Sequence, residues 1–229
     1  ISELTSNGVY EKLDVMYPMV GDTALEHSYN LINPDNNQMT FFGGWTHSST
    51  GSIPNGTTGY AETSYIPSVS SSLTSAHLSS YQRQVSDIGD SRATIGVDDD
   101  TNVLNGFGLG LFVTGTKQVG FIGCTNGLEY APPEASPVVN GFTSISVNGN
   151  RAAQHYVNGA TNGSTSTQTG ALSANQLYVG ATNRGGISTV NYFNKELAMI
   201  TVGSGLSATD VTNLYNSIQT FQTTLSRNV

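Results

Sequence analysis

The sequence predicts an all-β fold, an antiparallel β-sandwich closed by a single C-terminal α-helix. Short segments alternate polar and apolar residues with a period of two, as strands do when one face is buried. Eight Asn-Gly dipeptides punctuate the chain, and the apolar period becomes helical only near the C-terminus. A length of 229 residues suits one large sandwich, so we expect a single domain over residues 1–229.

The Asn-Gly dipeptides are the clearest local signal. Asparagine and glycine both tolerate positive φ, so the pair suits the type I′ turns that join antiparallel strands. The dipeptides begin at Asn7, Asn55, Asn105, Asn126, Asn140, Asn148, Asn158 and Asn162.

Seven segments between or after these turns are predicted strands. Alternating segments are residues 93–97, 107–113, 143–147, 153–157 and 177–179, whereas 119–124 and 197–202 are more evenly apolar. Continuous apolar runs are typical of strands buried on both faces. Closely spaced strands without intervening helices favour a sandwich or a barrel over a parallel α/β sheet.

The C-terminal segment predicts a helix over residues 207–225. Its apolar residues recur every three and four positions, and Ser207 followed by Asp210 has the spacing of an N-terminal cap. Near the start, Tyr10 to Tyr17 predicts a shorter helical turn that ends before Pro18.

Composition excludes several classes of partner. Eight Lys and Arg stand against 16 Asp and Glu, a net charge of −8, which repels phosphate backbones and argues against nucleic acid. The sequence contains no apolar run of the roughly 20 residues that cross a bilayer, so we expect no membrane partner. The single cysteine, Cys124, excludes an internal disulfide bond.

The second half of the chain resembles a known family of jelly rolls. The matching residues are His155-Tyr156-Val157-Asn158-Gly159, Leu177-Tyr178-Val179-Gly180, Glu196 to Ile200 and Leu206-Ser207. They resemble concanavalin A-like (laminin G type) domains, in which a Tyr-Val-Asp-Gly-like turn precedes a strand that ends in glycine. Asn158 replaces the usual aspartate and preserves the turn, because both residues accept the left-handed conformation. The resemblance implies an antiparallel jelly-roll sandwich.

Features along nearly the whole chain resemble a group of uncharacterised tailed-bacteriophage proteins. They are Leu13 to Gly21, Tyr29 to Leu31, Gly43 to Gly51, Pro54 to Gly56, Gly59 to Ala61, and the ending from Leu214 to Leu225. This resemblance implies a virion surface protein, a capsid decoration, fibre or tail component on the virion exterior. Other virion proteins would then be its partners, with cell-surface or environmental glycans as further ligands.

The residue patterns of catalysis are missing from the sequence. It lacks the Glu-x-Asp-x-x-Glu spacing with which this fold places a nucleophile and an acid together, and it contains no Gly-x-Ser-x-Gly elbow. Its four histidines show no close metal-ligand spacing. We therefore expect no enzyme, no catalytic residues and no cofactor apart from a structural calcium ion.

The run Asp98, Asp99, Asp100 and Asn102 is the candidate calcium site. Calcium takes six to eight oxygen ligands, and here carboxylate and amide oxygens are dense. Related jelly rolls often carry calcium at the rim. The alternative is a solvated acidic turn between strands, because the EF-hand spacing is absent.

Trp45, His47 and Tyr60 are the candidate glycan-binding residues. An aromatic platform with polar groups beside it is the general pattern of a sugar site. The alternative for Trp45, the only tryptophan, is a place in the core or at an intersubunit contact.

Three functions remain open. The leading hypothesis is a non-enzymatic virion surface protein that mediates attachment, and the alternative is a free carbohydrate-binding, lectin-like module. A polysaccharide hydrolase or lyase with an unfamiliar site is the third. The helix, rich in Tyr and Phe, supports either a homo-oligomer or a cap on its own sheet.

Overall fold

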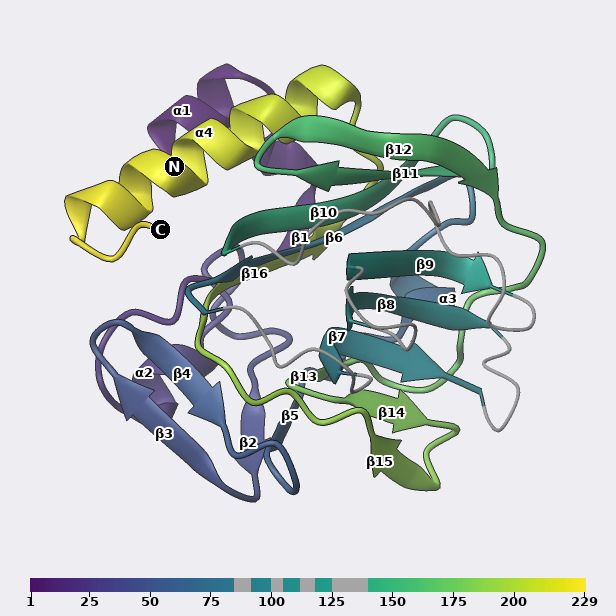
Figure 1. Ribbon diagram of the computed structural model, residues 1–229. Coiled ribbons are helices and arrows are strands. Elements are labelled where there is room, and N and C mark those ends of the chain that lie inside the picture. The colour runs from purple at the N-terminus through teal and green to yellow at the C-terminus, as the bar shows by residue number, and fades with distance from the viewer. Residues whose placement is uncertain (85–91, 100–104, 112–117, 125–139) are drawn as a thin grey trace.

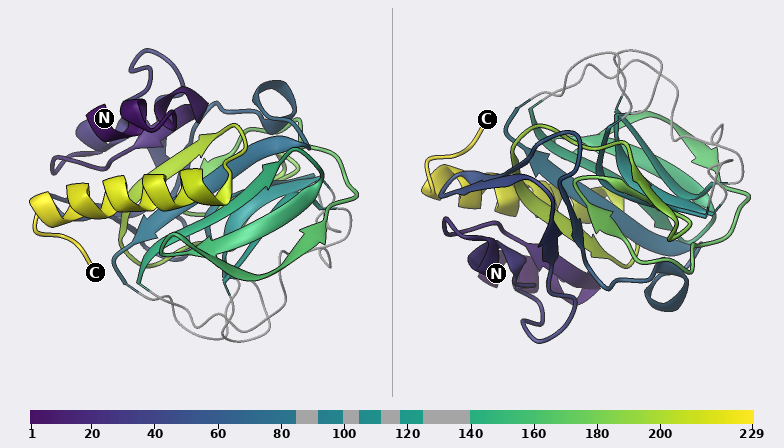
Figure 2. Two further views of the ribbon diagram at one scale, coloured as in Figure 1. Left: turned by 90° about the horizontal axis from the view of Figure 1, so that it is seen from above. Right: turned by 90° about the horizontal axis from the view of Figure 1, so that it is seen from below.

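The chain folds into two β-sheets that pack face to face, with helices on the outer face of one of them (Figure 1). The computed structural model describes residues 1–84, 92–99, 105–111, 118–124 and 140–229. Within these residues the strands form two sheets of eight. Seen from above and below, the long C-terminal helix and the N-terminal helix lie beside each other on the same side (Figure 2).

The first sheet has the strand order β12-β11-β10-β6-β16-β4-β3, and β1 pairs with β16 beside β4. Every pairing in it is antiparallel. Its strands are β1 (Leu13–Tyr17), β3 (Trp45–Ser48), β4 (Gly51–Pro54), β6 (Ser75–Gln82), β10 (Gly141–Asn148), β11 (Ala152–Val157), β12 (Ala160–Thr167) and β16 (Leu197–Gly203).

The second sheet has the order β15-β14-β7-β13-β5-β2, with β8 on β7 and β9 on β8. Its pairings are antiparallel except that of β14 with β7. Its strands are β2 (Thr40–Phe42), β5 (Tyr60–Glu62), β7 (Arg92–Asp98), β8 (Gly106–Leu111), β9 (Gln118–Cys124), β13 (Tyr178–Val179), β14 (Thr182–Arg184) and β15 (Ser188–Val190).

Two apolar clusters hold the layers together. The main core lies between the sheets and includes Leu78, Ile145 and Ile200 from the first sheet with Ile95 and Leu109 from the second. A second cluster lies between the outer face of the first sheet and the helices, where its members include Phe142, Leu214 and Ile218. The fold class predicted from the sequence is therefore confirmed, an all-β sandwich closed by a C-terminal helix.

The C-terminal helix α4 spans Ala208–Thr224, close to the predicted range. Ser207 caps it as predicted, since its hydroxyl accepts a hydrogen bond from the Asp210 backbone N–H and the Asp210 carboxylate returns one to the Ser207 backbone N–H. Val211, Leu214 and Ile218 turn inward onto the sheet. Because this face is buried against the chain's own sheet, α4 acts as a cap on the sandwich.

A buried arginine fastens the segment after α4 to the sandwich. Arg227 is fully buried, and its guanidinium donates to the carbonyl oxygens of Pro18 at 2.6 Å, Met19 at 2.9 Å and Ala198 at 3.1 Å. Its Nε donates to the Gln222 side chain at 2.5 Å. Five N–H donors in a planar fork suit such a cage of oxygens.

The segment predicted as a short helical turn near the N-terminus differs in the structure. Residues Tyr10 to Tyr17 form a short 3₁₀ turn, η1 (Tyr10–Lys12), followed by strand β1, so the predicted helix was wrong beyond Lys12. Pairing with β16 overrides the local preference of this segment. The remaining helices are α1 (Ser2–Ser6), α2 (Ala24–Ser28) and α3 (Pro67–Ser70).

The Asn-Gly dipeptides serve more than one purpose. Asn158 and Gly159, both with positive φ, form the predicted tight turn between β11 and β12. Asn162-Gly163 instead lies inside β12, where the pairing register shifts, so that predicted turn was wrong. Asn126-Gly127 lies outside the described residues.

Candidate glycan-binding surface

Three aromatic rings stack across neighbouring strands on the outer face of the second sheet. Phe42 on β2 stacks on Tyr60 of β5, with ring centroids 5.1 Å apart and planes 14° from parallel. Tyr60 stacks on Tyr178 of β13 at 4.8 Å and 22°. We call Phe42, Tyr60 and Tyr178 the aromatic row. Phe42 is 38% exposed at the end of the row, Tyr60 is half-buried and Tyr178 is buried.

Strand register explains why these rings share one face. Phe42 pairs with Tyr60, and Glu62 pairs with both Thr40 and Tyr178. Directly opposed residues of antiparallel strands point to the same side of a sheet, as do residues two apart on one strand. Neighbouring strands lie about 4.8 Å apart, which is also the spacing at which aromatic rings stack. The strand register and the pleat of the sheet therefore place the three rings side by side on one face.

Polar groups lie beside the rings. The Tyr178 hydroxyl donates to Glu62 Oε1 at 3.1 Å, and the Gln176 side chain also hydrogen-bonds to this hydroxyl. Burial and the Glu62 carboxylate raise the pKa of Tyr178 to about 12. Burial, followed by Glu62 and Tyr192, also raises the pKa of Tyr60. Both tyrosines therefore keep their hydroxyl protons at neutral pH, and the site combines ring faces, hydroxyls, an amide and a carboxylate.

Trp45, a candidate from the sequence, lies beneath the row. Its indole N–H donates to the backbone carbonyls of Phe42 and Tyr60, both at 3.1 Å. The ring is half-buried against the main core and lies over Gly180. Trp45 therefore holds the two strands that carry Phe42 and Tyr60.

His47, another candidate, contacts aromatic and histidine rings. It stacks on Trp45 at 6.1 Å and meets Phe41 edge-on at 4.7 Å. Its Nδ1 lies 3.0 Å from Nδ1 of His27, whose Nε2 donates to the Gly21 carbonyl at 3.1 Å. His27 Nδ1 must therefore accept the proton of His47 Nδ1. Burial lowers the pKa of both histidines, which makes this pair a neutral support beneath the surface.

Of the three glycan-binding candidates, the structure thus brings only Tyr60 into the aromatic row. Phe42, Glu62, Gln176 and Tyr178 were not selected from the sequence. One signal could have found Tyr178, because it alternates with Leu177 and Val179 on a predicted strand and must face outward. The register that sets Phe42 beside Tyr60 has no such local signal.

Half of the calcium candidates lie in the described part of the chain. Asp98 forms an ion pair with Arg184 at 3.3 Å. Asp99 accepts hydrogen bonds from the Ser173 hydroxyl and from the amides of Asn105, at 2.7 Å, and Asn175, at 3.3 Å. Amide N–H groups are not metal ligands, so this arrangement has the chemistry of a hydrogen-bonded acidic turn. Asp100 and Asn102 lie outside the described residues, so the calcium site stays a prediction.

Two further histidines are buried within the sandwich. His77 Nδ1 lies 2.6 Å from the Ser204 carbonyl and Nε2 lies 3.2 Å from the Thr201 hydroxyl. Burial lowers the pKa of His77 and of His155 to about 4. Across the described residues, no group of three or more His, Cys, Asp or Glu is placed to hold a metal ion.

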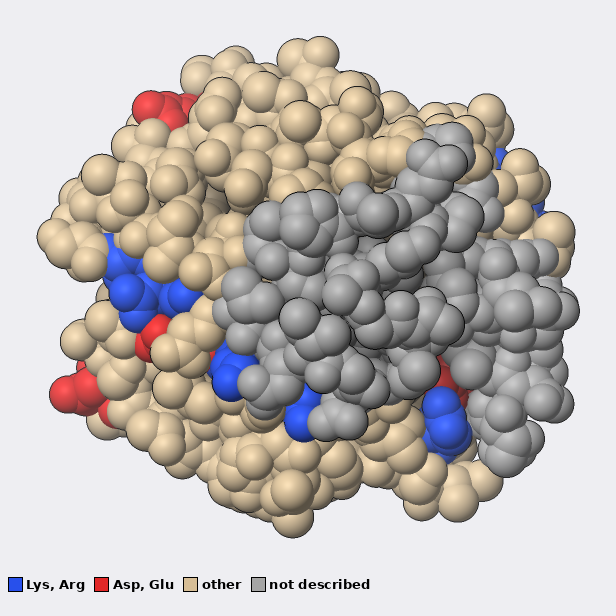
Figure 3. Space-filling view, in the orientation of Figure 1, with Lys and Arg blue, Asp and Glu red and all other residues tan. Residues whose placement is uncertain are grey.

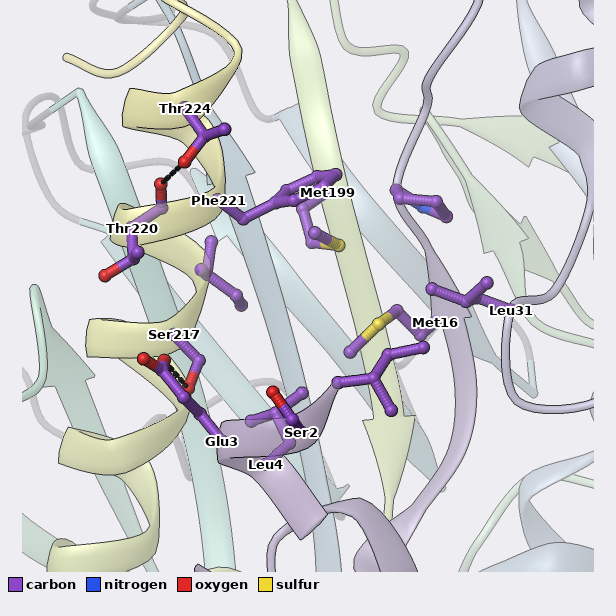
Figure 4. Close-up of a pocket in the computed structure, with 13 residues that line it drawn as sticks. Ser2, Glu3, Leu4, Met16, Leu31, Met199, Ser217, Thr220, Phe221 and Thr224 are labelled. Carbon is purple, nitrogen blue, oxygen red and sulfur yellow. Dashed lines mark hydrogen bonds between the residues drawn. The ribbon is translucent and has the colours of Figure 1, made fainter. Parts of the chain in front are cut away.

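A groove of about 380 Å³ separates α1 from α4 on the far side of the first sheet. Met16 and Met199 form its floor, while Leu4 and Phe221 flank it from the two helices (Figure 4). Glu3 and Ser217 hydrogen-bond to each other at its rim, 3.3 Å apart. The lining is mainly aliphatic, so the groove suits an apolar group better than a sugar.

Charged side chains are sparse on the part of the surface that can be seen between the grey atoms in Figure 3. This agrees with the low charged fraction of the chain, 10%. In the part of the chain that the structure describes, no helix is both long and apolar enough to span a membrane.

No protein-family model and no curated protein matches the sequence. Several solved structures match the fold. Domain 4 of AbnA, an extracellular arabinanase from Geobacillus stearothermophilus solved in complex with arabinotriose, matches with a TM-score of 0.59 and 14% identity, over 89% of this chain and 98% of that domain. The botulinum neurotoxin serotype D binding domain matches with a TM-score of 0.59 and 8% identity, over 92% of this chain and 53% of that one.

A mutant sialidase from Trypanosoma rangeli with trans-sialidase activity matches with a TM-score of 0.54 and 10% identity, over 91% of this chain and 33% of that one. At these identities the likeness shows the fold alone. The chain thus has a concanavalin A-like β-sandwich fold. None of these three structures is a bacteriophage protein.

Proposed function

We propose that the chain is a carbohydrate-binding, lectin-like module whose glycan site is the aromatic row, and that it binds sugars without cleaving them. The observation that carries this proposal is the stack of Phe42, Tyr60 and Tyr178 with Glu62 and Gln176 beside it. Aromatic surfaces cover the apolar faces of sugars, and the amide, hydroxyl and carboxylate groups fix their orientation. The fold supports the proposal, since domain 4 of AbnA, which shares it, was solved with arabinotriose.

Binding without catalysis is part of the same proposal. Glu62 has a phenol and not a second carboxylate as its described hydrogen-bond partner. Glycosidases of the usual kind need two carboxyl groups about 5 to 9.5 Å apart. A hydrolase or lyase remains the competing proposal, and release of reducing ends from polysaccharides by the purified protein would favour it.

A glycan array followed by calorimetric titration tests the proposed site. We expect hits on the array, and Phe42→Ala and Tyr60→Ala should each weaken binding about tenfold, because a stacked ring contributes roughly 1–2 kcal/mol. Tyr10→Ala is the matched control, since Tyr10 is a half-buried tyrosine on the helical side of the first sheet. Tyr10→Ala should bind like the wild type. An array without hits, repeated with calcium, would overturn the proposal.

The setting that we propose for this module is the exterior of a bacteriophage particle, where it would contact other virion proteins. The support is the sequence resemblance that runs from Leu13 to Leu225. Mass spectrometry of purified virions tests this setting separately from glycan binding. Absence of the protein from the particle would leave a free lectin-like module.

A further inference from the structure

A carboxylate, that of Glu62, lies beside the aromatic row and accepts a hydrogen bond from Tyr178. We propose that the row binds neutral glycans, through vicinal hydroxyl groups that donate to Glu62, and discriminates against glycans that carry a carboxylate or sulfate at the same position. This inference rests on the proposed glycan binding and names the ligand class for that site.

Glu62 is held in place to accept hydrogen bonds. It stands between Thr40 and Tyr178 in the strand register, and the Tyr178 hydroxyl donates to Oε1 at 3.1 Å. An ionised carboxylate accepts about four hydrogen bonds and donates none. One bond from Tyr178 leaves capacity for two sugar hydroxyls, and hydrogen bonds to a charged acceptor are about twice as strong as neutral ones.

The groups around the Glu62 carboxylate are uncharged. The Tyr60 and Tyr178 hydroxyls stay protonated because burial and the negative charge of Glu62 both raise their pKa values. The Gln176 amide lies at the Tyr178 end of the row. These groups offer both donors and acceptors to a sugar ring, while Glu62 supplies the formal charge that acts on both phenols.

An anionic sugar would meet repulsion at this position. Two like charges 4 Å apart cost about 1 kcal/mol in water and about 4 kcal/mol near a protein surface. The net charge of −8 adds to this locally unfavourable field. Arg92 is a cation near the row that would attract an anionic sugar and so oppose this repulsion. Its Nη1 donates to the Tyr192 carbonyl at 2.7 Å, and Tyr192 contributes to the raised pKa of Tyr60.

The test compares two oligosaccharides of equal length that differ only in a CH₂OH or a carboxylate at C6. Calorimetric titration of the intact chain at low ionic strength should show the neutral sugar binding at least about fivefold more tightly. Glu62→Gln keeps an oxygen for Tyr178 but removes the charge. It should weaken the neutral sugar severalfold and bring the two affinities together.

The outcomes separate this inference from the proposed function. If Tyr60→Ala weakens both sugars while the carboxylated one binds equally or more tightly in the wild type, the row is a glycan site and the neutral preference is wrong. If Arg92→Met abolishes binding of the carboxylated sugar, Arg92 is the group that recognises it. If neither sugar nor any array glycan binds, the proposed function itself fails.

Discussion

Replacing Arg227 with methionine removes the fastening between the C-terminal segment and the sandwich while keeping an extended, buried side chain. In the native structure the guanidinium donates to three backbone carbonyls within 3.1 Å and to Gln222. Each buried carbonyl that loses its donor costs about 1–3 kcal/mol, and relief of the buried charge offsets part of this. Three carbonyls that lose their donor, less this offset, give about 3–5 kcal/mol as our estimate for Arg227→Met.

Urea unfolding monitored by circular dichroism measures this loss as a lower transition midpoint. Arg227→Lys should fall between the two proteins, because an ammonium group has three donors where the guanidinium has five. Lys12→Met is the control, since Lys12 is 37% exposed in its ion pair with Asp210 and exposed pairs contribute about 0–1 kcal/mol. A loss below about 1 kcal/mol for Arg227→Met would refute the reasoning that these carbonyls depend on Arg227.

Three further predictions concern stability. Burial gives His77 a pKa of about 4 in the folded chain, against 6.5 when unperturbed. As the pH drops, the unfolded chain therefore binds the extra proton first. The free energy of unfolding should fall between about pH 6.5 and pH 4, by up to about 1.4 kcal/mol per pH unit. His77→Gln should flatten that slope in pH-dependent urea titrations, and an unchanged slope would contradict the assignment. Ser207→Ala should cost about 1 kcal/mol and Ser207→Gly a few tenths in thermal or urea unfolding, through loss of the α4 cap; equal stability of all three proteins would show that the cap contributes nothing. Gly180 has a φ of 80°, and an added Cβ would lie 2.8 Å from the Trp45 ring. Gly180→Ala should therefore cost about 1–3 kcal/mol of stability and shift the fluorescence of this sole tryptophan. An unchanged spectrum and an unchanged stability would argue against the close packing.

The sequence predicted those elements whose signal is local. All seven strands expected from alternation or apolar runs are present as β7 to β11, β13 and β16, although Val113 lies outside the described residues. The helix cap at Ser207 was also predictable, because both partners lie within one turn. The β6 strand was missed, since Ser75–Gln82 is rich in serine and carries little apolar alternation. Hydroxyl pairs such as Ser79 with Thr201 satisfy these buried polar groups, and only the tertiary structure supplies such partners.

The candidate site was less predictable than the fold, because its residues meet only in the tertiary structure. Tyr60 was selected because it follows a loop rich in aromatic and polar residues, but its stacking partners come from strands that are distant in sequence. Phe42 belongs to a three-residue strand, which is too short for a periodic signal. The alternation around Tyr178 predicts which way its ring faces, but not which rings it meets. The role of Trp45 depends on two backbone carbonyls, which no side-chain pattern reveals.

The most direct test of the central claim is calorimetric titration of the best array glycan into the wild type, Phe42→Ala and Tyr10→Ala proteins. Phe42 is the most exposed ring of the aromatic row, so its loss should disturb the surface with little effect on the core. We predict about tenfold weaker binding for Phe42→Ala and wild-type affinity for Tyr10→Ala. Equal affinity of all three proteins would show that any glycan site lies elsewhere on the chain.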